Sequence, residues 1–163
     1  MKVALIALSL AAAGCYAQRS DVDLPEEALG CSEGFTSIAG NCYRFYQEAE
    51  SWSDAQAFCS LGGAKLASVL NVDEYKGLLT HINNNFPGTY WTSGSVVLGQ
   101  WIWTATGDPM AGQWWGRNPG NRPGQCAYFC SNTLKYWNKD CSRSLRFICQ
   151  KPEEYLVRRP VAQ

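Results

Sequence analysis

The stretch that decides the fold is "SWSDAQAFCSLGG", residues 51–63. Ser51 suits the N-cap of a helix, and Asp54 follows it by three residues, which is typical of a first helical turn. Gly62 provides a stop signal. The pattern therefore predicts a helix that turns Cys59 towards the core. The predicted inward face carries Trp52, Ala55, Phe58 and Cys59.

A second helix is predicted by "NVDEYKGLLTHINNNF", residues 71–86. Asn71 suits the N-cap, and Glu74 follows it by three residues. Apolar side chains then recur at helical spacing, which indicates one buried face. That face comprises Val72, Tyr75, Leu78, Leu79 and Ile82.

Strand signals surround these two helices. "GFTSIAGNCYRFY", residues 34–46, alternates polar and apolar residues about the Gly40-Asn41 turn and predicts a hairpin. After Pro87 the chain becomes rich in aromatic residues and glycine, and a turn-rich loop runs over residues 108–125. We therefore expect an α+β fold with two helices, antiparallel sheets and one long loop, a kind of loop that is often functional. The strand-like phrases are "YWTSGS", "GQWIWTATG", "CAYF", "LKYWN" and "LRFICQ".

The two ends of the chain have a different character from its middle. Residues 1–17 combine an early Lys2, an apolar run and small residues, as a secretory signal peptide does. A lipoprotein box at Cys15 is the alternative, and the apolar run is too short to span a bilayer. Residues 18–30 predict a flexible lead-in and residues 152–163 a disordered tail. These boundaries leave residues 31–151 as one domain of a secreted, extracellular protein, with no membrane span expected in the mature chain.

The charge balance excludes two classes of partner. Without Lys2, the chain carries 13 basic and 14 acidic side chains, a balance of −1. Such a balance gives no support to nucleic-acid binding or to a polybasic membrane anchor.

Seven cysteines follow residue 17, and in an exported chain they predict a disulfide framework with one thiol left over. Spacing alone permits many pairings. Cys126 and Cys130 lie four residues apart, so either is a candidate partner for Cys141.

The order of these motifs resembles the long form of the C-type lectin domain over residues 31–151, most closely its secreted invertebrate members. This resemblance implies a disulfide-stapled fold with the pairs Cys31–Cys42, Cys59–Cys149 and Cys126–Cys141. It leaves Cys130 unpaired, either as a buried structural cysteine or as the bridge of a disulfide-linked dimer.

The resemblance also implies where calcium would bind. Calcium-dependent members carry a tripeptide with two side-chain oxygens, and counting from Trp114 places Asn118-Pro119-Gly120 on it. Gly120 has no side chain, and Lys139 is inserted where a carboxylate is expected. Because calcium gains affinity from ligand charge, we expect a degenerate site and no required cofactor. The remaining metal-ligand candidates are Asn118, Asn138 and Asp140.

A metal-free loop still offers a contact surface. Aromatic faces stack on sugar rings, and arginine and asparagine donate hydrogen bonds to them. The ligand-binding candidates are Trp115, Arg117, Asn118, Asn121, Arg122, Asn138 and Asp140. Trp114, Trp101 and Trp103 are expected to pack within the fold instead.

Catalysis has little support in the sequence. His81 is the only histidine, it falls near the end of the second predicted helix, and a surface position is expected for it. The sequence therefore predicts a recognition protein and no enzyme. The leading predicted function is glycan binding through the long loop, with weak or no calcium dependence. The expected setting is innate immunity. The alternative is a protein-binding or structural matrix module on the same fold.

Overall fold

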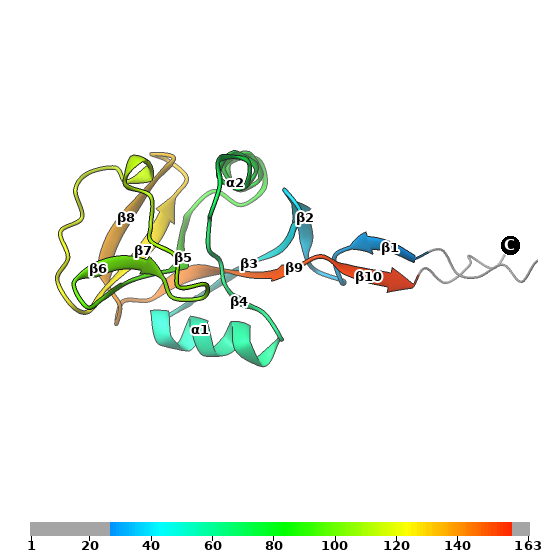
Figure 1. Cartoon of the computed structure of the whole chain (residues 1–163), viewed down its shortest axis with the longest axis horizontal. Coiled ribbons are helices and arrows are strands. Elements are labelled where there is room, and N and C mark those ends of the chain that lie inside the picture. Colours follow the sequence, from blue (N-terminus) through cyan, green and yellow to red (C-terminus); the bar gives the residue numbers. More distant parts are fainter. Residues whose placement is uncertain (1–26, 158–163) are drawn as a thin grey trace, which may run out of the picture.

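A computed structural model describes residues 27–157 of the 163-residue chain. The predicted signal peptide lies outside the described residues. Residues 27–157 form two helices and ten strands (Figure 1). In order they are β1 (Glu27–Gly30), β2 (Thr36–Ile38), β3 (Asn41–Glu50), α1 (Trp52–Leu61), β4 (Lys65–Leu66), α2 (Val72–Asn85), β5 (Thr89–Val97), β6 (Gln100–Trp103), the 3-10 turn η1 (Gly112–Trp114), β7 (Gln125–Cys130), β8 (Lys135–Asp140), β9 (Leu145–Pro152) and β10 (Glu154–Val157).

The main sheet has the strand order β2-β3-β9-β5-β7-β8, while β4 pairs with β9 and β6 pairs with β5. The helices α1 and α2 lie on opposite sides of these strands (Figure 1). The sheet is mixed, because β9 runs antiparallel to β3 and parallel to β5. The antiparallel sheet expected from the sequence is present, and its one parallel pair is β5–β9, where a strand late in the chain inserts between two early ones.

The helix α1 begins as predicted. The Ser51 Oγ accepts a hydrogen bond from the Asp54 amide at 3.2 Å, and Ala55 and Cys59 are buried. Phe58 was expected to be buried as well, but it is 48% exposed. Its ring packs edge-on against Tyr46, 4.8 Å between centroids, at the rim of the sheet. The helix lies over the edge of the apolar layer, so only the narrow strip around Ala55 and Cys59 is fully covered.

The helix α2 is also confirmed. The Asn71 Oδ1 accepts hydrogen bonds from the amides of Asp73 and Glu74, which caps its first turn. Leu78 and Ile82 are buried, as the spacing predicts. Val72 is expected to be buried but is 49% exposed, while Glu74 in the same turn is 3% exposed, so the buried face of α2 begins at Glu74.

Two apolar clusters fill the fold. One includes Leu78 and Ile82 of α2 together with Trp103 and Tyr136. The other includes Ala55 and Cys59 of α1. All three predicted disulfides are present, Cys31–Cys42, Cys59–Cys149 and Cys126–Cys141, and Cys130 is a half-buried free cysteine.

The strands β1 and β10 pair as an antiparallel ribbon, with Gly30 opposite Glu154. The expectations of a flexible lead-in and a disordered tail are therefore wrong for residues 27–30 and 154–157. The Cys31–Cys42 bond holds the end of β1 beside β3, and β3 pairs with β9, which leads into β10. The strands β1 and β10, which flank the domain, are thereby held in register with each other. Neither described helix is long and apolar enough to cross a membrane.

His81 is half-buried, so it is less exposed than the surface position expected for it. Its ring stacks on Phe45 with 4.9 Å between centroids and lies 5.8 Å from Phe86. The Nε2 atom is buried and has no hydrogen-bond partner among the described residues. Burial therefore lowers the pKa of His81 below its ordinary value, because the charged imidazolium loses hydration.

The disulfide that closes the longer loop should contribute more to stability. Cys59 and Cys149 are 90 residues apart, whereas Cys31 and Cys42 are 11 apart. Replacing Cys59 and Cys149 by alanine should lower the free energy of unfolding by about 4.6 kcal/mol, against about 2.8 kcal/mol for the shorter loop, because more entropy returns to the unfolded chain. Urea unfolding of the two double variants measures the difference, and equal costs would contradict this account.

Stability should fall as the medium is acidified through the titration of His81. The folded-state pKa of His81 lies below its unfolded value, so the unfolded state binds more protons as the pH drops. The free energy of unfolding should therefore decrease below about pH 6.5. His81→Gln should flatten this slope between about pH 7 and pH 5. His81 is the only histidine, so an unchanged slope would refute the assignment.

Candidate ligand-binding groove

The long loop is anchored to the core before it can present any side chain. Trp114 is buried and stacks on Tyr75 of α2 at 5.0 Å with the rings 5° from parallel. The Gly116 amide donates to the Tyr136 carbonyl of β8 at 2.9 Å, and the Met110 amide donates to the Trp101 carbonyl of β6 at 3.0 Å. The predicted core position of Trp114 is therefore confirmed, and the loop is fixed at three points.

A pair of tryptophans forms the floor of a groove beside this anchor. The Trp101 and Trp115 rings lie 4.7 Å apart between centroids at 59°. The Trp101 Nε1 donates to the Gly120 carbonyl, which ties β6 to the tip of the loop. The groove has a volume of about 560 Å³. Its lining residues are Gln100, Trp101, Met110, Gly112, Trp115, Asn118, Pro119, Gly120 and Asn121.

Trp101 is the groove residue that sequence reasoning missed, because alternation within a strand suggested packing for both Trp101 and Trp103. Trp103 is buried, as expected. Trp101 is half-buried, and its ring lines the groove. The sequence does not show which side chains of β6 border the loop, because the loop reaches β6 only in the folded chain.

The two asparagines of the groove are oriented by the loop backbone. The Asn118 Oδ1 accepts from the Gly120 amide at 3.1 Å, and the Asn121 Nδ2 donates to the Gly99 carbonyl at 3.1 Å. Each carboxamide is thus held at one end. The Asn118 Nδ2 and the Asn121 Oδ1 make no hydrogen bond to any residue from 27 to 157 and remain available to a ligand.

The four remaining candidates do not line the groove. Arg117 lies over the Trp137 ring at 5.7 Å, and Arg122 is exposed on the loop. The Asn138 Nδ2 donates to the Gln125 Oε1 at 3.0 Å across the β7–β8 pair. Asp140 accepts from the amide and the hydroxyl of Ser142 at 2.9 and 2.8 Å, and these bonds lower the pKa of its carboxyl.

These side chains do not fit a calcium ion. Calcium takes about six to eight oxygen ligands and prefers carboxylates. The candidates Asn118, Asn138 and Asp140 supply one carboxylate, and its Oδ1 already accepts two hydrogen bonds from Ser142. The Asn118 Oδ1 is engaged by the Gly120 amide. Lys139, between Asn138 and Asp140, adds a positive charge.

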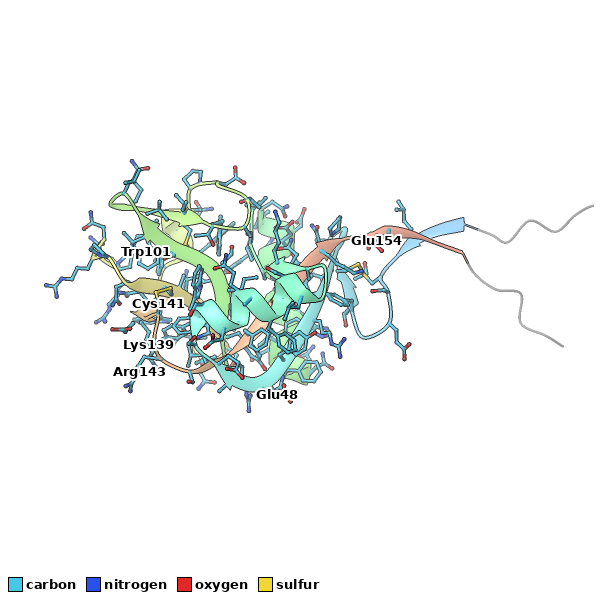
Figure 2. The ribbon with its side chains drawn as sticks, turned by 90° about the horizontal axis from the view of Figure 1, so that it is seen from below. Glu48, Trp101, Lys139, Cys141, Arg143 and Glu154 are labelled. Carbon is cyan, nitrogen blue, oxygen red and sulfur yellow. A yellow bond between two sulfur atoms is a disulfide. The ribbon has the colours of Figure 1, made fainter. Side chains whose placement is uncertain are left out.

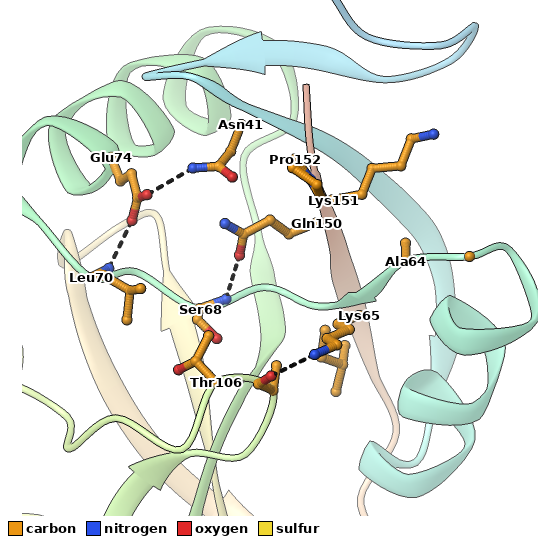
Figure 3. A pocket seen from close by; sticks show the side chains of 13 residues that line it. Asn41, Ala64, Lys65, Ser68, Leu70, Glu74, Thr106, Gln150, Lys151 and Pro152 are labelled. Carbon is orange, nitrogen blue, oxygen red and sulfur yellow. Dashed lines mark hydrogen bonds between the residues drawn. The ribbon is translucent and has the colours of Figure 1, made fainter. Parts of the chain in front are cut away.

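A second cavity, of about 290 Å³, lies between the start of α2 and the β4–β9 pair and was not foreseen (Figure 3). Its polar centre is Glu74, which is only 3% exposed. The Glu74 Oε1 accepts from the Asn41 Nδ2 at 2.9 Å, and its Oε2 accepts from the Leu70 amide at 2.7 Å. Nearby, the Gln150 Oε1 accepts from the Ser68 amide at 2.7 Å. Both carboxylate oxygens therefore join the β2–β3 turn to the start of α2.

These elements and disulfides define a C-type-lectin-like fold, and the comparisons with known proteins agree. The model of the Lectin C-type domain matches residues 48–151. A lectin of Pleurodeles waltl is 31% identical, over 90% of this chain and 91% of its own length. A snaclec of Gloydius halys, described as a coagulation factor IX/factor X-binding protein, is 27% identical over 74% and 82%. The chain belongs to the C-type lectin domain family.

A solved structure supports the same assignment. The structure of a calcium-independent type II antifreeze protein superposes with a TM-score of 0.67. It is 27% identical, and the match covers 78% of this chain and 98% of that one.

Removing the Glu74 carboxylate should destabilise the fold. Glu74→Ala leaves the Asn41 amide group and the Leu70 amide, both part-buried, without their acceptor, at a cost of about 2 kcal/mol. Asp73→Ala, one residue earlier and exposed, is the matched control and should cost less than about 1 kcal/mol. Urea unfolding measures both values, and equal losses would show that the buried bonds are not what Glu74 contributes.

Proposed function

We propose that this protein is a secreted recognition protein that binds glycans in the Trp101–Trp115 groove without calcium. The observation that carries the proposal is the pair of indole rings beside two oriented carboxamides. The apolar face of a sugar ring packs on an indole, while its hydroxyls accept and donate hydrogen bonds. The Asn118 Nδ2 and the Asn121 Oδ1 supply one donor and one acceptor for them.

The groove is rigid enough to bind with little loss of conformational entropy. Trp115 packs on Tyr136 as well as on Trp101, and Trp101 is bonded to Gly120. Asn121 is bonded to the backbone of Gly99 in the β5–β6 turn. Side chains that are already ordered lose less freedom when a ligand arrives, which favours affinity for a small sugar.

Calcium independence is supported by the donor set and by relatives. The candidate ligands supply one carboxylate, and its Oδ1 accepts two hydrogen bonds from Ser142. The antifreeze protein that resembles this chain is described as calcium-independent, and one sequence relative of this chain is described as a lectin. Secretion is supported by the signal-like residues 1–17 and by three disulfides, which persist in oxidising compartments.

A protein ligand is the second candidate function. The snaclec relative is described as binding coagulation factors, so this fold also serves protein recognition in that relative. An exposed Arg122 and the groove aromatics also suit a protein surface. A disulfide-linked dimer through half-buried Cys130 stays a prediction. No catalytic role is proposed, because the sole histidine is packed against Phe45 and Phe86.

A glycan array tests this function on the purified mature chain. We expect binding that is equal with calcium and with a chelator. Trp115→Leu should weaken it by about tenfold, the equivalent of about 1.4 kcal/mol, because an aliphatic side chain offers no flat face to the sugar. Phe58→Leu, a loss of an exposed aromatic on α1, is the matched control and should have no effect.

Three outcomes of the array would contradict the proposal. Binding that disappears with the chelator would mean that Asn118, Asn138 and Asp140 hold calcium after all. Binding that survives Trp115→Leu would place the sugar elsewhere. An absence of glycan binding, combined with capture of a protein that Trp115→Leu abolishes, would favour the protein-ligand alternative.

A further inference from the structure

The outer face of the β7–β8 pair lies outside the groove. Side chains alternate along each strand, and Phe129 and Tyr136 point into the core. Tyr128 and Trp137, which are opposite each other in register, therefore lie on the other face and are half-buried. One side of the Tyr128 ring packs on the buried Trp91, 6.1 Å between centroids. Lys139 lies two residues from Trp137 on the same face, at the end of the molecule opposite to Glu154 (Figure 2).

A cation lies over each of these two aromatic rings. The Arg117 guanidinium carbon lies 5.7 Å from the centroid of the Trp137 ring. The Lys139 Nζ lies 5.5 Å from the centroid of the Tyr128 ring. We call Arg117, Tyr128, Trp137 and Lys139 the cation–aromatic face. A cation over a ring is attracted to the π-electrons but keeps its net charge, so it can still bind an anion.

No ion pair between residues 27–157 engages the basic side chains of this face. The one ion pair among residues 27–157 joins Lys151 to Glu154, at the other end of the molecule (Figure 2). Lys135, two residues before Trp137, donates only to the Gln113 carbonyl at 3.4 Å. Asp140 is the nearest acidic residue in sequence, and its Oδ1 accepts two hydrogen bonds from Ser142. The basic side chains of this face are therefore not held in ion pairs by residues 27–157 and can contact a partner.

The aromatic part of the face is fixed in place. The Trp137 Nε1 donates to the Thr133 Oγ1 at 2.8 Å. Gly116 packs so closely on the Trp137 ring that a Cβ atom there would lie 2.4 Å from it. The Gly116 amide is bonded to Tyr136, so the loop passes tightly over the ring and sets Arg117 on it. The absence of a side chain at residue 116 thus positions Arg117.

We propose that the cation–aromatic face binds a linear anionic polysaccharide. Lys135 and Lys139 are separated by about 14 Å along an extended strand, with Trp137 between them. A chain of sugars that carry sulfate or carboxylate groups matches this order, because its rings stack on aromatic faces while its anions reach the cations. None of the residues that define this face lines the Trp101–Trp115 groove, so the inference is independent of the proposed function.

Heparin, a sulfated polysaccharide, is the probe for this face, and the disulfide-bonded full chain is titrated with it. Binding should weaken steeply as NaCl is raised, because bound cations of the polyanion are released. Arg117→Gln combined with Lys139→Gln should weaken binding by at least about tenfold. The control is Arg44→Gln combined with Lys76→Gln, which removes the same charge elsewhere. Arg44 lies 5.1 Å from the Tyr46 ring, so the control also removes a cation over an aromatic ring, and it should change heparin affinity little.

Several results would overturn the inference. One such result is an equal loss of heparin affinity in the two double variants, which would indicate a response to net charge alone. Another is tighter binding to phosphatidylserine vesicles or to duplex DNA than to heparin, because the partner would then not be a polysaccharide. If the Arg117/Lys139 variant does not fold, acetylation of Lys139 in the unmodified protein decides the matter. Heparin should slow that acetylation relative to Lys76, and equal rates would refute the proposal.

Discussion

The position of β9 is the constraint on which the rest of the structure depends. This strand comes late in the chain, yet it lies between β3 and β5 and pairs with both. The Cys59–Cys149 disulfide joins it to α1. With the middle of the sheet closed by residues from both halves of the chain, the segment between β6 and β7 runs along one edge, and Trp114 is its one buried side chain. Binding surfaces are therefore built there.

That edge segment separates two surfaces of different chemistry. Trp115 packs on Trp101 and helps to form an uncharged groove with carboxamides. Two residues later, Arg117 crosses the Trp137 ring on the outside of β8. Gly116 lies between them and allows the close approach to β8. One short run of chain thus gives a neutral surface suited to sugar rings and a cationic surface suited to anions.

The candidate calcium ligands take part in local hydrogen bonds. The oxygens that remain at the expected positions accept hydrogen bonds from nearby groups, the Asn118 Oδ1 from Gly120 and the Asp140 Oδ1 from Ser142. The loop is anchored by Trp114 on Tyr75, so its shape depends on aromatic packing.

The sequence by itself determined the two helices, the hairpin about Gly40 and the α+β class, because caps, turns and apolar spacing act over a few residues. Together with the family resemblance it also fixed the disulfide pairs. Only the tertiary structure decided the exposure of Phe58, the packing of half-buried His81 on Phe45, the place of Trp101 in the groove and the pairing of β1 with β10. Those outcomes depend on which distant segments meet, and local spacing carries no information about that.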